Sequence, residues 1–392
     1  MTAADAPGVA TRRLALDVLA RIEDDGAYAN LALRTALDRS DLVDVDRRMV
    51  TDLVAGTERR RRALDHLVDR FLTSDPPPAG RRALRLGAYQ LAYRDDLPDY
   101  AVVSSTVAAA PKRFRGLVNA VLRQVATTPR TFPSPGIELS YPDWVVERLT
   151  TDLGESTALD ALAAMNVAPS AHRRDDGYTQ DLASQWVATA VEAGPGDRVL
   201  DVCAAPGGKA TAIASSGAVV VAAELGAARV PLVAAAAARY GHGSTFAVRS
   251  DGLHPAVRPG SFDRVLVDAP CSGLGVLRRR PDARWRIAAD APDRLGALQT
   301  QLVEAAVPLV RPGGLLVFSV CTLTVAESTA VDDRLAERHP ELAPLPALGE
   351  PWLPWGRGSM LLPQAADTDG MVVFRYRVPV GSPATSPVES RP

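Results

Sequence analysis

The sequence predicts an α/β fold class, in which a Rossmann-like domain with a parallel sheet follows an all-α N-terminal domain. Two observations support this prediction. Apolar residues between positions 11 and 126 recur at helical spacing, without a run of β-branched residues long enough for a sheet. From about residue 178, short apolar runs alternate with helical stretches, a pattern typical of βαβ units and of a sheet with helices on both faces.

Periodic apolar residues define the predicted helical domain. Leu14, Val18 and Ile22 recur every four residues and therefore share one face of a helix. The prolines and the glycine of residues 127–136 end the helical pattern. We therefore expect a helical domain over residues 1–130.

The rest of the chain is divided by the same signals. Residues 131–177 are expected to form a linker with a helical stretch at 141–165, and residues 178–380 the α/β domain. The tail, residues 381–392, is rich in proline and serine and is expected to be disordered. Within the α/β domain we expect strands at 198–200, 218–223, 262–267 and 315–318, and helices at 227–240 and 295–310.

Composition excludes several classes of protein. With 392 residues, of which 47% are hydrophobic, the chain can bury a full core. It has no apolar run of about 18 residues and no N-terminal signal-peptide pattern. We expect a soluble, cytoplasmic protein without a membrane partner.

The cysteine count argues against disulfides and metals. Three cysteines are too few for a disulfide framework, and no Cys-x2-Cys or Cys/His cluster is present. We therefore expect free thiols, no metal site and a monomer.

Positive charge is concentrated at the N-terminal end. The net charge is −2, yet residues 1–130 carry 21 Arg plus Lys against 17 Asp plus Glu. Arginine-rich clusters occur at 59–62, 112–115 and 278–280. Such clusters either contact the phosphates of a nucleic acid or form solvated surfaces.

A glycine-containing turn follows the first predicted strand. The segment Asp201 to Lys209 reads Asp-Val-Cys-Ala-Ala-Pro-Gly-Gly-Lys and leads from a strand into a helix, where nucleotide ligands bind in doubly wound sheets. It matches neither Gly-x-Gly-x-x-Gly nor the P-loop, so neither NAD nor ATP is indicated.

Acidic residues follow the first three strands. Glu224 can accept hydrogen bonds from ribose hydroxyls, and Asp251 from an adenine amino group. Acids in these places without a phosphate cradle suit a cationic adenosine cofactor, S-adenosylmethionine, although each acid alone could be a helix cap. The expected cofactor-binding residues are Cys203, Ala204, Ala205, Pro206, Gly207, Gly208, Lys209, Glu224, Arg229, Asp251, Gly252 and Asp268.

Two of the three cysteines lie at strand ends. Cys271 follows the strand that ends near Asp268, and Cys321 follows the later strand at 315–318. A thiolate is a strong nucleophile, so this pair indicates covalent chemistry. Cys203, by contrast, has the place of a small buried hydrophobic residue.

Three motifs together resemble one enzyme family. Asp-x-Cys-Ala-Ala-Pro-Gly-Gly-Lys, Asp-Ala-Pro-Cys-Ser-Gly-x-Gly and Ser-x-Cys-Thr, in this order, resemble the Nol1/Nop2/Sun family of RNA cytosine-5 methyltransferases. The resemblance implies a Rossmann-like, S-adenosylmethionine-dependent methyltransferase that acts on RNA, with small-subunit (16S) rRNA expected. A tRNA methyltransferase and a non-catalytic RNA-binding or ribosome assembly factor are the alternatives.

The helical domain resembles the NusB family. The resemblance rests on Gly26–Asn30, on the Leu-Arg-Leu-Gly-Ala-Tyr-Gln-Leu segment at 84–91 and on Val118–Arg123. It implies that residues 1–130 are a NusB-like RNA-binding domain.

The resemblance also implies catalytic roles. Cytosine C5 is a poor nucleophile, so a thiolate must first add to C6. Cys321 is the implied nucleophile and Cys271 the residue that helps the product leave. Asp268 would contact the N3/N4 edge of the base, and the charge of Lys209 would favour a thiolate. The alternative assignment makes Cys271 the nucleophile, as in DNA cytosine-5 methyltransferases, where the attacking cysteine follows a proline.

Two segments bear on RNA binding. Residues 167–179 are shorter than the corresponding stretch of the resembled family, where it helps to form an RNA-binding subdomain. The basic and aromatic residues of 278–286 are expected to hold RNA that flanks the target base, although Trp285 could equally pack against the protein.

Overall fold

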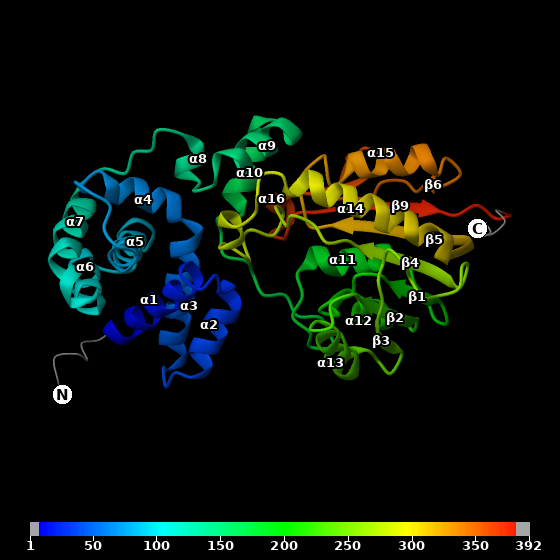
Figure 1. Ribbon diagram of the computed structural model, residues 1–392, viewed down its shortest axis with the longest axis horizontal. Coiled ribbons are helices and arrows are strands. Elements are labelled where there is room, and N and C mark those ends of the chain that lie inside the picture. Colours follow the sequence, from blue (N-terminus) through cyan, green and yellow to red (C-terminus); the bar gives the residue numbers. More distant parts are fainter. Residues whose placement is uncertain (1–7, 382–392) are drawn as a thin grey trace, which may run out of the picture. The chain divides into compact units, whose positions relative to one another are not determined.

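The structure, a computed structural model, describes residues 8–381 and divides into two compact units (Figure 1). The first, here called the helical unit, comprises Met1–Glu147 and Leu277–Ile287. The second, the α/β unit, comprises Arg148–Val276 and Ala288–Pro392. The C-terminal tail, which the sequence predicts to be disordered, lies outside the described residues.

All regular elements of the helical unit within the described residues are helices. Their apolar faces form one core, in which Leu19, Leu53, Leu84 and Leu122 are fully buried. The elements are α1 (Val9–Glu23), α2 (Ala29–Asp38), α3 (Asp44–Arg59), α4 (Arg61–Asp69), α5 (Pro78–Tyr93), α6 (Asp99–Ala109), η1 (Lys112–Phe114), α7 (Arg115–Thr127), α8 (Pro135–Glu138), the start of α9 (Asp143–Leu153) and η2 (Ala283–Trp285).

Helix α5 lies at the centre of this unit. Its Gly87 faces Leu122 of α7 so closely that an added Cβ would lie 2.3 Å from Leu122 Cδ1. A Cβ on Gly56 of α3 would lie 1.9 Å from Tyr89 of α5. Larger side chains at either glycine would therefore force neighbouring helices apart.

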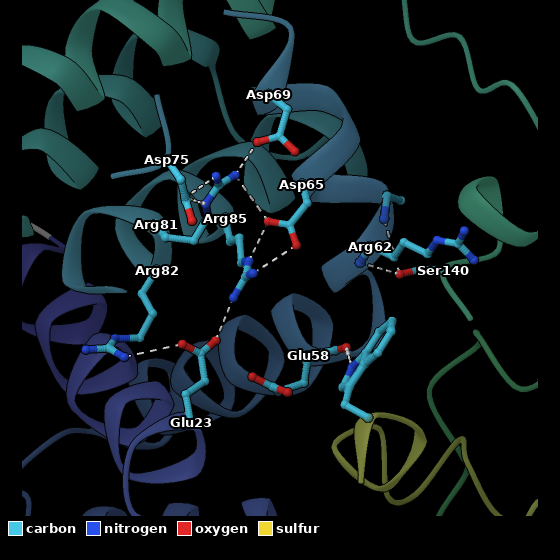
Figure 2. A network of polar contacts seen from close by, with 12 residues as sticks. Glu23, Glu58, Arg62, Asp65, Asp69, Asp75, Arg81, Arg82, Arg85 and Ser140 are labelled. Atoms are coloured by element: carbon cyan, nitrogen blue, oxygen red, sulfur yellow. Dashed lines mark hydrogen bonds and ion pairs between the residues drawn. The ribbon is translucent and has the colours of Figure 1, made fainter. Parts of the chain in front are cut away.

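A network of ion pairs ties α1, α4 and α5 together (Figure 2). The Arg85 guanidinium donates to both carboxylate oxygens of Asp65, at 2.7 and 2.8 Å, and to Glu23 Oε1 at 2.8 Å. Arg82 also donates to Glu23, and Arg81 pairs with Asp69. Because Arg85 and Glu23 are largely buried, each depends on the other for compensation of its charge.

Removing Arg85 should destabilise the helical unit. Arg85→Met leaves Glu23 without one of its two cations in a largely buried place, and we expect a loss of about 3 kcal/mol in the free energy of unfolding. Urea denaturation followed by circular dichroism measures this loss. Arg34→Met is the matched control, because Arg34 and its partner Asp38 are 81% and 60% exposed, and it should cost less than about 0.5 kcal/mol. Equal effects of the two substitutions would contradict the role given to the network.

The segment Leu277–Ile287, expected to hold RNA, is instead part of the packing of the helical unit. Arg278 and Arg284 are buried, and Arg284 lies over the Tyr141 ring at 4.0 Å. Trp285 Nε1 donates to the carbonyl oxygen of Glu58 at 2.8 Å. The RNA-binding expectation is therefore wrong for Arg278 and Arg284, which are buried, whereas Trp285 packs within the protein, the alternative stated for it.

The α/β unit contains a single mixed sheet. Its order is β3-β2-β1-β4-β5-β9-β8-β7, with β6 also paired to β9. The strands are β1 (Arg198–Asp201), β2 (Val219–Glu224), β3 (Thr245–Arg249), β4 (Phe262–Asp268), β5 (Val310–Val320), β6 (Ala343–Pro344), β7 (Leu353–Trp355), β8 (Gly358–Leu361) and β9 (Met371–Arg377).

Helices cover both faces of this sheet. In Figure 1, α14 and α15 lie on one face and α11, α12 and α13 on the other. The helices are α10 (Glu155–Ala164), α11 (Leu182–Ala190), α12 (Gly208–Ala214), α13 (Val230–Tyr240), α14 (Ala291–Ala306), η3 (Val307–Leu309), α15 (Thr329–Arg338) and α16 (Pro363–Ala366), with α9 ending at Leu153.

The predicted fold class is confirmed. Strands β1 to β5 pair in parallel, and the central runs of β4 and β5 are fully buried, as expected for strands covered on both faces. The antiparallel strands after residue 340 were not predicted, nor was the early start of β5 at Val310. The helix expected at 295–310 begins earlier, at Ala291, and ends at Ala306, where η3 leads into β5. None of the described helices is both long and apolar enough to cross a membrane.

Candidate functional site

The predicted site residues meet at the carboxyl ends of the parallel strands. Asp268, the last residue of β4, pairs in register with Ser319 of β5. The loops after these two strands carry Cys271 and Cys321, and the loop after the neighbouring β1 leads to Lys209. Ligands bind outside this edge of doubly wound sheets.

The two cysteines of these loops lie side by side. Their Sγ atoms are 3.2 Å apart, within hydrogen-bonding distance for sulfur. The hydrogen bond with Cys321, together with burial, raises the pKa of Cys271 well above its usual value. Two thiols at this distance cannot both ionise easily, since like charges repel. The raised pKa favours the protonated thiol form of Cys271.

Asp268 is held beside the thiols by two partners. Lys209 Nζ donates to Asp268 Oδ2 at 2.7 Å, and Ser319 Oγ donates to Oδ1 at 2.7 Å. Burial opposes the charge on Lys209, but the ion pair with Asp268 outweighs it and raises the pKa of Lys209, with a further contribution from Cys321. Lys209 is thus a cation close to Cys321, and a cation in that place stabilises a thiolate.

The turn between β1 and α12 has the form expected of a ligand loop. Gly207 adopts a φ of 106°, and its amide donates to the carbonyl of Ala204 at 2.6 Å. Cys203, Ala205 and Pro206 complete this turn, and burial raises the pKa of the Cys203 thiol far above its usual value, which makes that thiol unreactive.

Segment 167–179, which is short compared with the RNA-binding stretch of the resembled family, contacts the turn between β1 and α12 directly. Arg174 donates to the carbonyl of Gly208 at 2.7 Å, to Gln180 Oε1 at 3.0 Å and to Thr211 Oγ1 at 3.1 Å. Its guanidinium also lies 4.7 Å from the centre of the Tyr178 ring. The short segment therefore supports the ligand loop, a role that the sequence did not predict.

The acids after the first three strands differ in their surroundings. Glu224 is buried, and its Oε1 accepts a hydrogen bond from Gly226 N at 2.7 Å and forms an ion pair with Arg229 at 2.7 Å. Asp251 Oδ1 accepts from Leu253 N at 2.9 Å, and Oδ2 pairs with His254 at 3.2 Å. The Asp251 carboxylate thus serves a turn in this structure.

Asp201 is the most unusual of these acids. It is 0% exposed, and neither carboxylate oxygen has a hydrogen-bond partner among the described residues. Burial, together with the nearby charge of Asp268, raises the pKa of Asp201 to about 7. A buried carboxylate without a donor is costly, and a cationic ligand would relieve that cost.

These residues fit a cationic adenosine cofactor. The orphaned Asp201 carboxylate can receive a positive group, and Gly252 lies against the same loop, since a Cβ there would be 2.7 Å from Val202 Cγ1. The sequence places Asp201 among the acids at the strand ends, but the expected cofactor-binding residues did not include it. Its place at the end of a buried strand was the available signal, but its lack of partners is a tertiary property.

Another residue missed from the sequence is Glu327. Its carboxylate lies buried behind the cysteine loops and accepts hydrogen bonds from Ser272 and Thr322. The only sequence signal was that a hydroxyl residue directly follows each cysteine.

Comparison with known proteins finds a matching family for each of the two parts of the chain. Residues 188–377 match the family described as 16S rRNA methyltransferase RsmB/F, and residues 9–127 match the NusB family.

Similar proteins extend over nearly the whole chain. The ribosomal RNA small subunit methyltransferase B of Thermus thermophilus is 38% identical, with 86% of this chain and 89% of that protein covered. The probable ribosomal RNA small subunit methyltransferase B of Bacillus subtilis is 30% identical, with 93% and 98% covered.

One solved structure shows the same fold. The crystal structure of PH0851 has a TM-score of 0.78 at 19% identity and covers 95% of this chain and 99% of its own. The motifs around the paired thiols, the matching sheet and the extent of these similarities agree, and the chain belongs to the RsmB/F family of 16S rRNA methyltransferases, with an N-terminal NusB-family region.

Proposed function

We propose that this protein transfers a methyl group from S-adenosylmethionine to C5 of a cytosine in RNA, with small-subunit (16S) rRNA as the substrate. The observation that carries the proposal is the pair of thiols of Cys271 and Cys321, 3.2 Å apart at the ends of adjacent strands. The ion pair of Lys209 and Asp268 lies at the same edge of the sheet. Covalent catalysis at a pyrimidine needs such a nucleophile beside groups that hold the base.

In this mechanism Cys321 is the nucleophile. Its thiolate, stabilised by the Lys209 cation, adds to cytosine C6 and thereby makes C5 electron-rich. The Asp268 carboxylate, fixed by Lys209 and Ser319, accepts a hydrogen bond from the N4 amino group and orients the ring. The target base has to leave any stack before this addition.

Release of the methylated base requires that the bond between Cys321 and C6 be broken again. After C5 has gained its methyl group, the C5 proton passes to solvent water and the electron pair of the C5–H bond expels Cys321 Sγ from C6, which restores the thiolate and the aromatic ring. Cys271, whose raised pKa favours the protonated thiol, touches Cys321 and is placed to assist this release by donating a hydrogen bond to the departing Cys321 sulfur.

The cofactor supplies an electrophilic methyl group when it is bound. The turn over residues 203–209 and Gly252 would border it, Asp201 would receive a positive group of it, and Glu224 would accept hydrogen bonds from ribose hydroxyls. Gly226 N and Arg229 both contact Oε1 of Glu224, so Oε2 is the oxygen that this proposal assigns to the ribose. Asp251 would have to loosen its turn to reach an adenine.

Two observations support rRNA as the substrate. The relatives with the same two-part organisation carry names that refer to small-subunit rRNA. The NusB-family region, residues 9–127, adds a helical unit that the chemistry itself does not need and that is suited to RNA binding.

A direct assay tests this proposal. The protein is incubated with labelled S-adenosylmethionine and either unmethylated small-subunit rRNA or tRNA, and the digested RNA is analysed by mass spectrometry. We expect 5-methylcytidine in the rRNA only. Product in tRNA only would favour a tRNA methyltransferase, and cofactor binding without product on any RNA would favour a non-catalytic RNA-binding factor.

A further inference from the structure

Glu327 lies between the two cysteine-bearing loops. It precedes α15, is 0% exposed, and is five positions beyond Thr322 in the sequence. A buried carboxylate must be compensated by hydrogen bonds or cations, so the identity of its donors shows what it holds in place.

The donors to Glu327 come from both loops. Oε1 accepts from Ser272 N at 2.6 Å and from Gln299 Nε2 at 3.2 Å. Oε2 accepts from Ser272 Oγ at 2.5 Å, from Thr322 Oγ1 at 3.0 Å and from Thr324 Oγ1 at 3.0 Å. Five donors thus converge on one carboxylate, a charge-assisted arrangement with little freedom to shift.

Two of these donors are the immediate neighbours of the cysteines. Ser272 directly follows Cys271, and Thr322 directly follows Cys321. Their hydroxyls also contact each other at 3.1 Å, in parallel with the 3.2 Å contact of the two Sγ atoms. The Glu327 side chain therefore joins the two loops that carry the thiols, in addition to the backbone hydrogen bond from Gly275 N to the carbonyl of Cys321 at 3.0 Å.

Gln299 of α14 connects the Glu327 carboxylate to the start of the Cys271 loop. Its Nε2 donates to the carbonyl of Pro270 at 3.0 Å as well as to Glu327. The backbone on both sides of Cys271 is consequently tied to the same carboxylate, while Cys271 itself stays free to meet Cys321.

We propose that Glu327 is a positioning residue that holds the Cys271 loop against the Cys321 loop and so keeps the two thiols in contact during the reaction. This inference rests on the proposed function, because Glu327 would keep the thiols in contact between two steps of that reaction, attack by Cys321 and release assisted by Cys271. The negative charge of Glu327 also contributes to the raised pKa of Cys271 and so helps that thiol to keep its proton.

The first test compares Glu327→Ala with Glu327→Gln. Alanine removes all five acceptor contacts and should lower kcat about 100-fold, the effect of misplacing a reacting group by about 1 Å, while KM for RNA and Kd for the cofactor stay within about twofold. Glutamine should retain most of kcat, because hydroxyl groups can accept from its amide as well as donate to it.

The matched control is Asp332→Asn. Asp332 is a buried carboxylate in the same unit, but it accepts from Arg357 and Tyr376, neither of which belongs to a cysteine loop. We expect this variant to lose stability while kcat per folded enzyme is unchanged. If Glu327→Ala lowered activity only in proportion to its loss of folded protein, as a purely structural residue would, the proposal would be overturned.

A second test needs no methyl transfer. The oxidant diamide converts two adjacent thiols to a disulfide and is itself reduced to the hydrazine. In the full-length protein, Cys271 and Cys321 should form this bond readily, and Glu327→Ala should slow its formation about tenfold or more, as peptide mass spectrometry would show. The variant Ser272→Ala/Thr322→Val should be slowed by a smaller factor, because Ser272 N, Gln299 and Thr324 still donate to Glu327. Adding Glu327→Ala should then lower the rate to that of Glu327→Ala alone.

The two tests separate the two proposals. If the wild type made no 5-methylcytidine but Glu327→Ala still slowed disulfide formation, the proposed function would fail and the positioning role would stand. If methylation occurred and Glu327→Ala matched the wild type in both kcat and disulfide formation, only the role of Glu327 would be refuted.

Discussion

Cys321→Ala should abolish methyl transfer, whereas Cys271→Ala should leave a covalent protein–RNA adduct. Without the Cys321 thiolate no bond to cytosine C6 can form, and we expect kcat to fall by at least about 10³-fold. Without Cys271 the addition still occurs, but the bond is not efficiently broken, so the enzyme accumulates on its RNA. The 3.2 Å contact lets both thiols act on one cytosine, and the raised pKa of Cys271 supports its part in release.

Denaturing gel electrophoresis with labelled RNA distinguishes the two variants. The adduct should be absent with Cys321→Ala, present with Cys271→Ala and transient in the wild type. Both variants should bind the cofactor as the wild type does, which controls for misfolding. An adduct that persists in Cys321→Ala and disappears in Cys271→Ala would reverse the assignment and make Cys271 the nucleophile.

Asp201→Asn should change both the stability and the cofactor affinity of the protein. The pKa of Asp201 in the folded state is about 7, above the usual value of 3.8. Its contribution to stability is therefore fully present below about pH 4 and is lost as the pH rises through 7. The raised pKa corresponds to about 4 kcal/mol. The asparagine variant stays neutral, so its free energy of unfolding should lack this decrease.

The same substitution tests the cofactor site. An ionised Asp201 would attract a cationic ligand, so the wild type should bind S-adenosylmethionine more tightly as the pH rises through 7, with release of a proton. Asp201→Asn should bind about 10- to 100-fold more weakly at pH 8, the loss of one charge-assisted hydrogen bond, and without this pH dependence. Isothermal titration calorimetry measures both effects. Equal affinity of the two proteins at pH 8 would show that Asp201 does not contact the cofactor.

The sequence predicted the strands of the parallel sheet better than the rest of the fold. The buried apolar runs that became β1, β2, β4 and β5 are local signals, and their alternation with helices implies parallel pairing. The run Met371–Arg377 is equally apolar at its start, but it pairs antiparallel with β5. That pairing depends on contacts between distant residues, for which local pattern offers no signal.

The basic segment after Cys271 shows where a prediction from composition fails. Arginines and a tryptophan in a loop beside an active site are typical of RNA binding, but composition does not reveal what they contact. Arg284 is buried against Tyr141, and Trp285 bonds Glu58, which are distant along the chain. Tertiary packing converted an apparent RNA-binding loop into part of the helical unit.

For the site itself, the sequence alone determined that Asp268, Cys271 and Cys321 would lie near one another, because neighbouring parallel strands bring their carboxyl ends to one edge of a sheet. It also determined the family, through motifs that are local in the chain. Only the tertiary structure decided that Asp201 has no donor among the described residues and that Glu327 accepts hydrogen bonds from both cysteine loops. Burial and hydrogen bonding between residues some 55 positions apart arise from packing, and no local pattern specifies them.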